Sequence, residues 1–138
     1  RSGYTQNATA ETFPADLNPF TISLAQEAIK PAAMWRIVTI GSRCIGFRMT
    51  GSLLSDETDS RKVEEKLDGE VMAVPEKIQV GLQAMMEKFS IVYASSDFIE
   101  DKAGKLWFID LNPEGQWGAY EQRFGVPISE FIIGEIEA

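Results

Sequence analysis

The sequence has 138 residues, of which 44% are hydrophobic and 25% charged, a balance typical of one globular domain. Its net charge of -8 argues against nucleic acid as the main partner, because neutralising a phosphate backbone needs clustered Lys and Arg. Histidine is absent, which excludes His-based triads and His-containing zinc sites, and no apolar run is long enough to span a membrane. The single cysteine, Cys44, lies in an apolar strand pattern and is interpreted as a buried, inert thiol.

The first part of the chain is polar and rich in turn-forming residues. Residues 1–20 therefore predict a loop or the end of a preceding segment, and residues 24–29 a short strand or a connector. The sequence begins at Arg1 without an initiator Met or a signal-peptide pattern, so we expect it to belong to a longer, cytoplasmic protein.

A hairpin and a helix follow. Residues 35–40 and 43–49 read as two strands around Gly41-Ser42, with Gly41 supplying the positive φ of a type II′ turn. Residues 55–70 have almost no apolar content and predict a solvated, mobile loop. Residues 75–89 predict a helix that starts at Pro75. Its apolar face is expected to comprise Ile78, Leu82, Met85, Met86 and Phe89.

The last third predicts a second hairpin and a second helix. Residues 90–99 and 105–111 read as strands joined by a turn at 101–104, and residues 127–136 as an amphipathic helix. The order β-β-(loop)-α-β-β-(loop)-α predicts an α+β fold, an antiparallel sheet with helices on one face.

Polar side chains interrupt the strands of the second hairpin. Asp110 and Asn112 end an apolar strand and point to the same face, because strand side chains alternate. Asp97 is an acid inside the preceding strand, and buried acids are costly unless they are paired or bind a cation. With a four-residue loop, Asp97 would lie opposite Phe108 and diagonal to Asp110 on one face; a three-residue loop would destroy this arrangement.

Two carboxylates and an amide oxygen are ligands for a hard cation. The set predicts Mg²⁺ or Mn²⁺ with coordination positions left for waters and nucleotide phosphates. The alternative is that Asp97 caps a bend while Asp110 and Asn112 make local turn bonds.

These motifs carry a family resemblance. Asp97, the turn and Asp110-Leu111-Asn112 resemble the metal-binding hairpin of the ATP-grasp superfamily, where Glu-x-Asn with a longer reach is usual. Residues 108–117 resemble the Asn-Pro-x-Gly-Gln-Trp signature of ATP-grasp ribosomal peptide maturases, the graspetide (microviridin-type) synthetases. Residues 26–29 look like the adenine-contacting connector of these enzymes, and residues 35–41 are similar to their Leu-Arg-Val-Thr-Val-Val-Gly hairpin.

The resemblance implies that residues 21–138 form the C-terminal, nucleotide- and metal-binding lobe of an ATP-grasp ligase. Such an enzyme uses ATP and Mg²⁺ (or Mn²⁺) to convert a carboxylate into an acyl phosphate, which a hydroxyl or amine attacks to give an ester or amide. The implied partner is a precursor peptide, with no nucleic acid or membrane. The oligomeric state is open, with a homodimer as one option.

The resemblance also assigns roles to residues. The metal ligands would be Asp97, Asp110 and Asn112, and the adenine or ribose contacts Gln26, Glu27 and Ile29. Arg36 would stabilise the transferring phosphoryl group; the alternative is a structural ion pair at the sheet surface. Arg61 would be a second catalytic residue, although Asp59-Ser60-Arg61 stands where these maturases carry Asp-Trp-Arg. Trp117 is expected to pack the hairpin against the last helix.

Two other functions remain compatible with the sequence. One is an ATP-grasp carboxylate–amine ligase that adds an amino acid to a peptide or protein. The other is a degenerate, non-catalytic ATP-grasp binding module.

Overall fold

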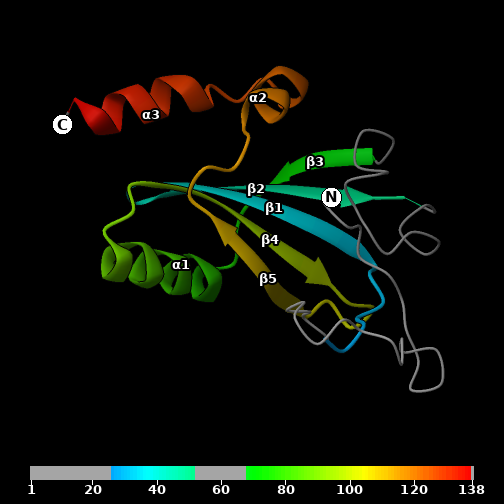
Figure 1. The fold of residues 1–138 in the computed structure, drawn as a ribbon. Coiled ribbons are helices and arrows are strands. Elements are labelled where there is room, and N and C mark those ends of the chain that lie inside the picture. The colour runs from blue at the N-terminus through cyan, green and yellow to red at the C-terminus, as the bar shows by residue number, and fades with distance from the viewer. Residues whose placement is uncertain (1–25, 52–67, 138) are drawn as a thin grey trace, which may run out of the picture.

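The computed structural model describes residues 26–51 and 68–137, so the predictions for residues 1–20 and for Arg61 lie outside the described residues. Five strands and three helices make up these two segments (Figure 1). In chain order they are β1 (Ala33–Ile40), β2 (Arg43–Thr50), β3 (Asp68–Met72), α1 (Glu76–Phe89), β4 (Tyr93–Glu100), β5 (Leu106–Asn112), α2 (Gly118–Phe124) and α3 (Ile128–Ile136).

The strands form one antiparallel sheet in the order β3-β2-β1-β4-β5, which confirms the predicted α+β class. The turn between β1 and β2 is the predicted one: Gly41 has a φ of 53°, whereas the φ of Ser42 is not positive. A positive φ at the first central residue alone fits a type II′ turn.

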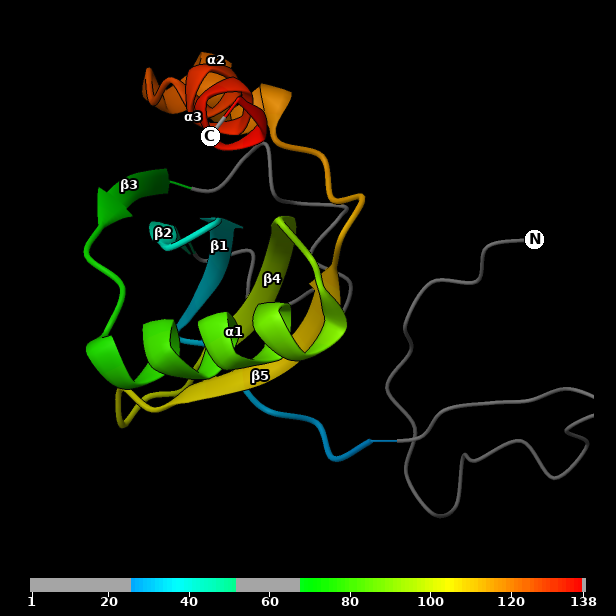
Figure 2. The ribbon, with the colours of Figure 1, turned by 90° about the vertical axis from the view of Figure 1, so that its left-hand side faces the viewer.

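The helices cover both faces of the sheet, whereas the sequence predicted them on one face. Figure 2 shows α1 on one side and α2 with α3 on the other. Toward α2 and α3, β1 and β2 present Val38, Ile40 and Phe47, which pack with Tyr120 and Ile128. Because successive side chains of β1 alternate and each set is mostly apolar, both faces of the strand have apolar surface to bury.

The second core lies between the sheet and α1. Trp35 and Ile37 of β1 pack there with Phe98 of β4, with Leu82 of α1 and with Val74, which precedes α1. The two faces together make β1 the most buried strand of the sheet, with 0% exposure at Ile37.

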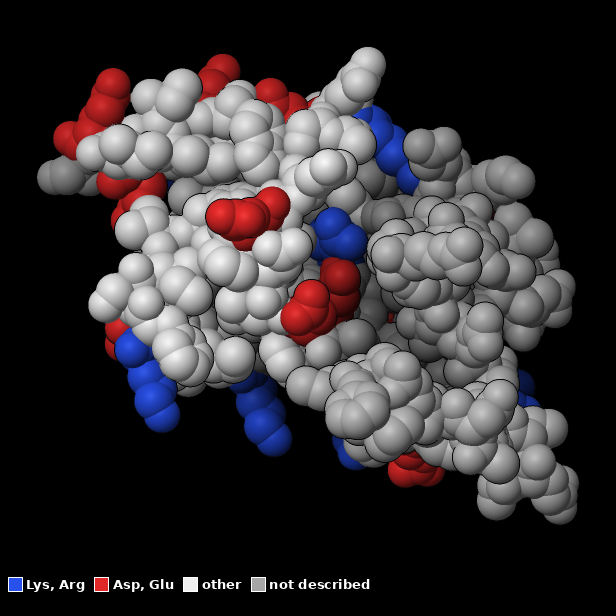
Figure 3. All heavy atoms as spheres, in the orientation of Figure 1, with Lys and Arg blue, Asp and Glu red and all other residues white. Residues whose placement is uncertain are grey.

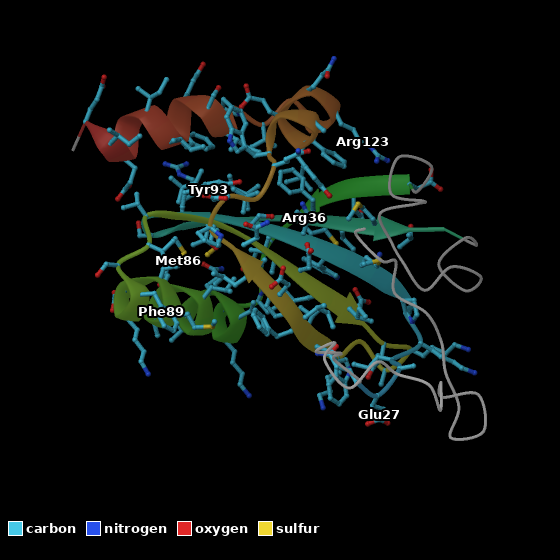
Figure 4. The ribbon with its side chains drawn as sticks, in the orientation of Figure 1. Glu27, Arg36, Met86, Phe89, Tyr93 and Arg123 are labelled. Atoms are coloured by element: carbon cyan, nitrogen blue, oxygen red, sulfur yellow. The ribbon has the colours of Figure 1, made fainter. Side chains whose placement is uncertain are left out.

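The predicted helix at 75–89 is confirmed as α1, with Pro75 as its N-cap residue. Its C-terminus is closed by Ser90, which has a left-handed φ of 53°. Leu82 and Met86 are buried, but Phe89 is 62% exposed and does not belong to the predicted apolar face. Figure 4 shows Met86 on the side of α1 that faces the sheet.

Two elements were not predicted. β3 occupies residues 68–72 and therefore overlaps the predicted loop at 55–70; all its side chains are exposed, and it is held by backbone pairing with β2. α2 is short, and its sequence has no repeating apolar pattern long enough to identify a helix. Among the described residues, no helix combines the length and the apolar character needed to cross a bilayer.

An ion-pair network stabilises the sheet face that bears Trp35. Arg48 Nε donates to Glu100 Oε2 at 2.8 Å, and Trp35 Nε1 donates to the same oxygen at 2.6 Å. The hydrogen bond from Arg48 holds the pKa of Glu100 below its ordinary value. The carboxylate therefore stabilises the fold at neutral pH, and this contribution is lost as the pH falls through the lowered pKa.

We expect Glu100→Gln to lower the free energy of unfolding by about 1–2 kcal/mol at pH 7, because it removes a charge-assisted hydrogen bond. The difference from the wild type should shrink as the pH falls below the ordinary pKa of a Glu, about 4.3. Urea unfolding of both proteins between pH 7 and pH 3 measures it. A difference that stays constant with pH would show that the Glu100 charge is not the stabilising feature.

Candidate functional site

Asp97 and Asp110 lie directly opposite each other on β4 and β5, and so on the same face of the sheet. The predicted register was wrong: the hairpin pairs Glu100 with Leu106 and has a five-residue loop. That loop alone would place the two carboxylates on opposite faces. A β-bulge restores the parity, because the pairing passes from Phe98↔Phe108 to Asp97↔Asp110 and leaves Ile109 as the extra residue.

Arg36 extends this row of side chains onto β1, where it is the register partner of Asp97. Its Nε donates to Asp97 Oδ1 at 2.5 Å and its Nη2 to Oδ2 at 3.4 Å. The guanidinium also lies 5.3 Å from the centre of the Tyr120 ring of α2. The structural ion pair that the sequence left as an alternative for Arg36 is therefore present.

Burial raises the pKa of Asp97 above its ordinary value, and the nearby charge of Asp110 adds to the rise, while Arg36 opposes it. Arg36 therefore offsets only part of the cost of burying the Asp97 charge. The Asp110 side chain has no hydrogen bond or ion pair among the described residues. In Figure 3, acidic atoms border basic ones near the centre of the visible face.

Asn112 shares the face of Asp110 and is paired with Ser95 of β4. Its Oδ1 accepts the backbone N–H of Glu114 at 2.8 Å, so the local turn bond expected as an alternative exists for this residue. An amide oxygen has two lone pairs and can accept this bond and still bind a cation. Within residues 26–51 and 68–137, no group of three or more Asp, Glu, Cys or His is placed to hold a metal ion. The ligands that this face offers to a metal ion are the two carboxylates of Asp97 and Asp110 and the amide oxygen of Asn112.

The turn after β5 folds back onto the same face and is held there. Tyr93 Oη donates to the carbonyl oxygen of Gly115 at 2.6 Å. A Cβ on Gly115 would stand 2.3 Å from the Cβ of Ser95, so only glycine fits at this position. Trp117 packs on the core beside α2 and α3, as its predicted packing role requires. These contacts fix Asn112 at the start of the turn.

Gly115→Ala should lower the stability by about 1–3 kcal/mol, since the new methyl group would overlap a rigid Cβ and displace the turn. Gly134→Ala is the matched control, because nothing lies within 4 Å of a Cβ at that helical position. Alanine there should be neutral or stabilising by up to about 1 kcal/mol. Thermal unfolding of both variants makes the comparison; equal effects would mean that the turn is loosely packed.

The predicted adenine-contacting segment is not in contact with the carboxylates. Gln26 and Glu27 are exposed and Ile29 is half-buried, in a stretch without regular structure. Figure 4 shows Glu27 beyond the start of β1, away from Arg36. The structure thus brings together Arg36, Asp97, Asp110 and Asn112. Glu27 of the predicted segment lies apart from them (Figure 4).

Sequence reasoning missed the aromatic residues around Arg36. Tyr93 precedes Asp97 by four positions in β4, so the two side chains lie on the same face of the strand. The alternation of strand side chains could have indicated this from the sequence. The place of Tyr120 over Arg36 depends on α2, whose position the sequence pattern does not specify.

No protein-family model matches the sequence, and no curated protein matches it. Solved structures do. Macrocyclase MdnB from Microcystis aeruginosa MRC is similar over 78% of this chain and 38% of its own, with a TM-score of 0.62 and 22% identity. A RiPP-associated ATP-grasp ligase from Chryseobacterium gregarium, in complex with ADP and a leader and core peptide, is similar over 75% of this chain and 32% of its own, with a TM-score of 0.64 and 17% identity.

The ATP-grasp ligase PsnB, in complex with a precursor variant, Mg and ADP, is similar over 80% of this chain and 34% of its own, with a TM-score of 0.58 and 15% identity. The chain has the fold of part of an ATP-grasp ligase. It spans about a third of the length of these proteins. The ATP-grasp resemblance inferred from the sequence is confirmed at the level of the fold.

Proposed function

We propose that this chain is the C-terminal lobe of a cytoplasmic ATP-grasp ligase that forms ester or amide bonds on a ribosomally made precursor peptide. The observation that carries the proposal is the placing of Asp97 directly opposite Asp110, with Asn112 on the same face. The resemblance of residues 108–117 to the peptide-maturase signature, and the ATP-grasp fold, support the peptide as substrate.

The donor set suits a hard divalent cation. Carboxylate and amide oxygens without sulfur or imidazole favour Mg²⁺ or Mn²⁺ over softer metals. Asp97 and Asp110 are neighbouring like charges, and the pKa of Asp97 is raised, so a cation between them would be stabilised. When bound, Mg²⁺ would link nucleotide phosphates to the lobe and offset the charge that develops during phosphoryl transfer.

The remaining chemistry is positioning and neutralisation. Arg36, on the same face as both carboxylates, would donate hydrogen bonds to the transferring phosphoryl group or to the acyl phosphate. We assign adenine or ribose contacts to Gln26, Glu27 and Ile29, the last through its backbone. Arg61 is proposed as a second cation for the reacting groups. The peptide carboxylate is activated as an acyl phosphate, and a side-chain hydroxyl or amine displaces phosphate.

The test is turnover by the full-length protein with ATP and candidate precursor peptides, followed by mass spectrometry. Each new ester or amide within one peptide lowers its mass by one water, with ADP and phosphate as coproducts. A mass gain by one amino-acid residue would identify instead a ligase that extends peptides or proteins. ATP binding without turnover of any peptide or amino acid would contradict the proposal and favour a non-catalytic module.

A further inference from the structure

Arg36 has two partners that hold it in different ways. Asp97 binds its guanidinium through both carboxylate oxygens, at 2.5 and 3.4 Å. The Cζ atom of the same guanidinium lies over the Tyr120 ring, 5.3 Å from its centre. The Arg36 side chain is 19% exposed and that of Asp97 is 35% exposed, so the pair is partly shielded from water.

A divalent cation at Asp97 would compete with Arg36. Asp97 and Asp110 together carry two negative charges, which one divalent cation balances. With the guanidinium also retained at Asp97, the group would carry an excess positive charge at close range. Repulsion between two cations a few ångströms apart in a partly desolvated site favours the departure of the more weakly held one.

Tyr120 keeps a released guanidinium near the site. Its ring is buried, is 5.0 Å from the ring centre of Phe47, and its hydroxyl lies 3.9 Å from the sulfur of Met49. The ring is thus fixed by the core while the Arg36 guanidinium is bound to Asp97 by its edge. A cation–π contact depends on the charge of the guanidinium and does not require its N–H groups to bind a carboxylate. The Arg36 N–H groups can therefore turn from Asp97 to another anion while the contact with Tyr120 is kept.

We infer that Arg36 is an exchangeable counter-ion of the proposed metal site: a divalent cation at Asp97 and Asp110 displaces its guanidinium, which stays on Tyr120 and becomes available to phosphoryl oxygens. The inference rests on the proposed function, because it takes Asp97 and Asp110 as metal ligands. The exchange couples metal binding to phosphate binding. Arg36 is released to bind phosphate only when the metal that accompanies the nucleotide has bound Asp97 and Asp110.

Mn²⁺ binding to the full-length protein, without nucleotide, tests the exchange. Electron paramagnetic resonance of the free ion gives the dissociation constant. We expect Arg36→Gln to bind Mn²⁺ about tenfold more tightly than the wild type, because the competing cation is gone. Arg48→Gln is the matched control: Arg48 also pairs with a strand carboxylate, Glu100, but belongs to the separate network with Trp35, and its removal should leave the affinity unchanged.

Asp110→Asn separates the two proposals, since its exposed side chain has no partner among the described residues and the variant should fold. If this variant loses Mn²⁺ binding while Arg36→Gln binds no more tightly than the wild type, the exchange is overturned and the metal site stands. If Asp110→Asn keeps wild-type affinity, the metal site fails and the exchange fails with it.

A second readout follows the guanidinium itself. In ¹⁵N–¹H spectra of the arginine side chains, Mg²⁺ should shift the Nε–H signal of Arg36 and speed its exchange with water, while that of Arg48 stays in place. Loss of the signal in Arg36→Lys assigns it. An Arg36 signal that is unchanged at saturating Mg²⁺ would overturn the inference.

Discussion

Asp110→Asn in the full-length protein is expected to lower the rate of ATP-dependent peptide ligation by about a hundredfold to a thousandfold, the loss of several kcal/mol of charge stabilisation in the transition state. The substitution keeps the shape of the side chain and removes its charge. The Asp110 side chain is exposed and makes no hydrogen bond or ion pair among the described residues, so stability should change little.

Initial rates of ADP release at saturating peptide measure this effect, with unfolding curves recorded in parallel. Glu87→Gln is the control, since Glu87 is an exposed acid on α1 whose removal changes the net charge equally. Asp97→Asn should be comparably inactive, and the double variant little worse, because the two carboxylates would act on one ion. An Asp110→Asn enzyme with wild-type turnover would exclude this carboxylate from the reaction.

Phe47→Ala should have the largest effect on stability, a loss of about 3–5 kcal/mol. Phe47 is fully buried in β2, and its ring centre lies 5.0 Å from those of both Tyr120 and Phe124. The cavity would therefore open between the sheet and α2. The site would be affected as well, because Tyr120 would lose the contact that fixes it over Arg36.

Urea unfolding followed by circular dichroism measures the loss. Phe89→Ala provides the matched control: the same side chain is removed from α1, where it is 62% exposed, and the expected change is within about 0.5 kcal/mol. If the two substitutions cost the same, the packing of α2 on the sheet does not determine the stability of this fold.

Local sequence signals predicted the elements that depend on local chemistry. Gly41 identified the first hairpin because one positive φ is needed there, and the spacing of Leu82 and Met86 identified α1. β3 was missed because its side chains are exposed and its stability comes from backbone pairing with β2, which a sequence pattern does not record. The distribution of helices over both faces depends on long-range packing and was predicted wrongly.

In the candidate site, too, local features were predicted from the sequence and long-range ones were not. Alternation correctly put Asp110 and Asn112 on one face. Asp97 was also predicted to share that face, but it does so because two unpredicted features of the hairpin offset each other. The hairpin loop is one residue longer than predicted, and the bulge at Ile109 compensates. The ion pair of Arg36 with Asp97 requires the β1–β4 register, which joins strands about 60 residues apart in the chain.

Calorimetric titration of Mg-ATP into the full-length protein tests most directly that Asp97, Asp110 and Asn112 hold the metal ion of a nucleotide site. Wild type and Glu87→Gln should bind with equal affinity, and Asp110→Ala at least about tenfold more weakly, since each tenfold corresponds to 1.4 kcal/mol. Equal affinities in all three proteins, or no binding heat with the wild type, would contradict this assignment.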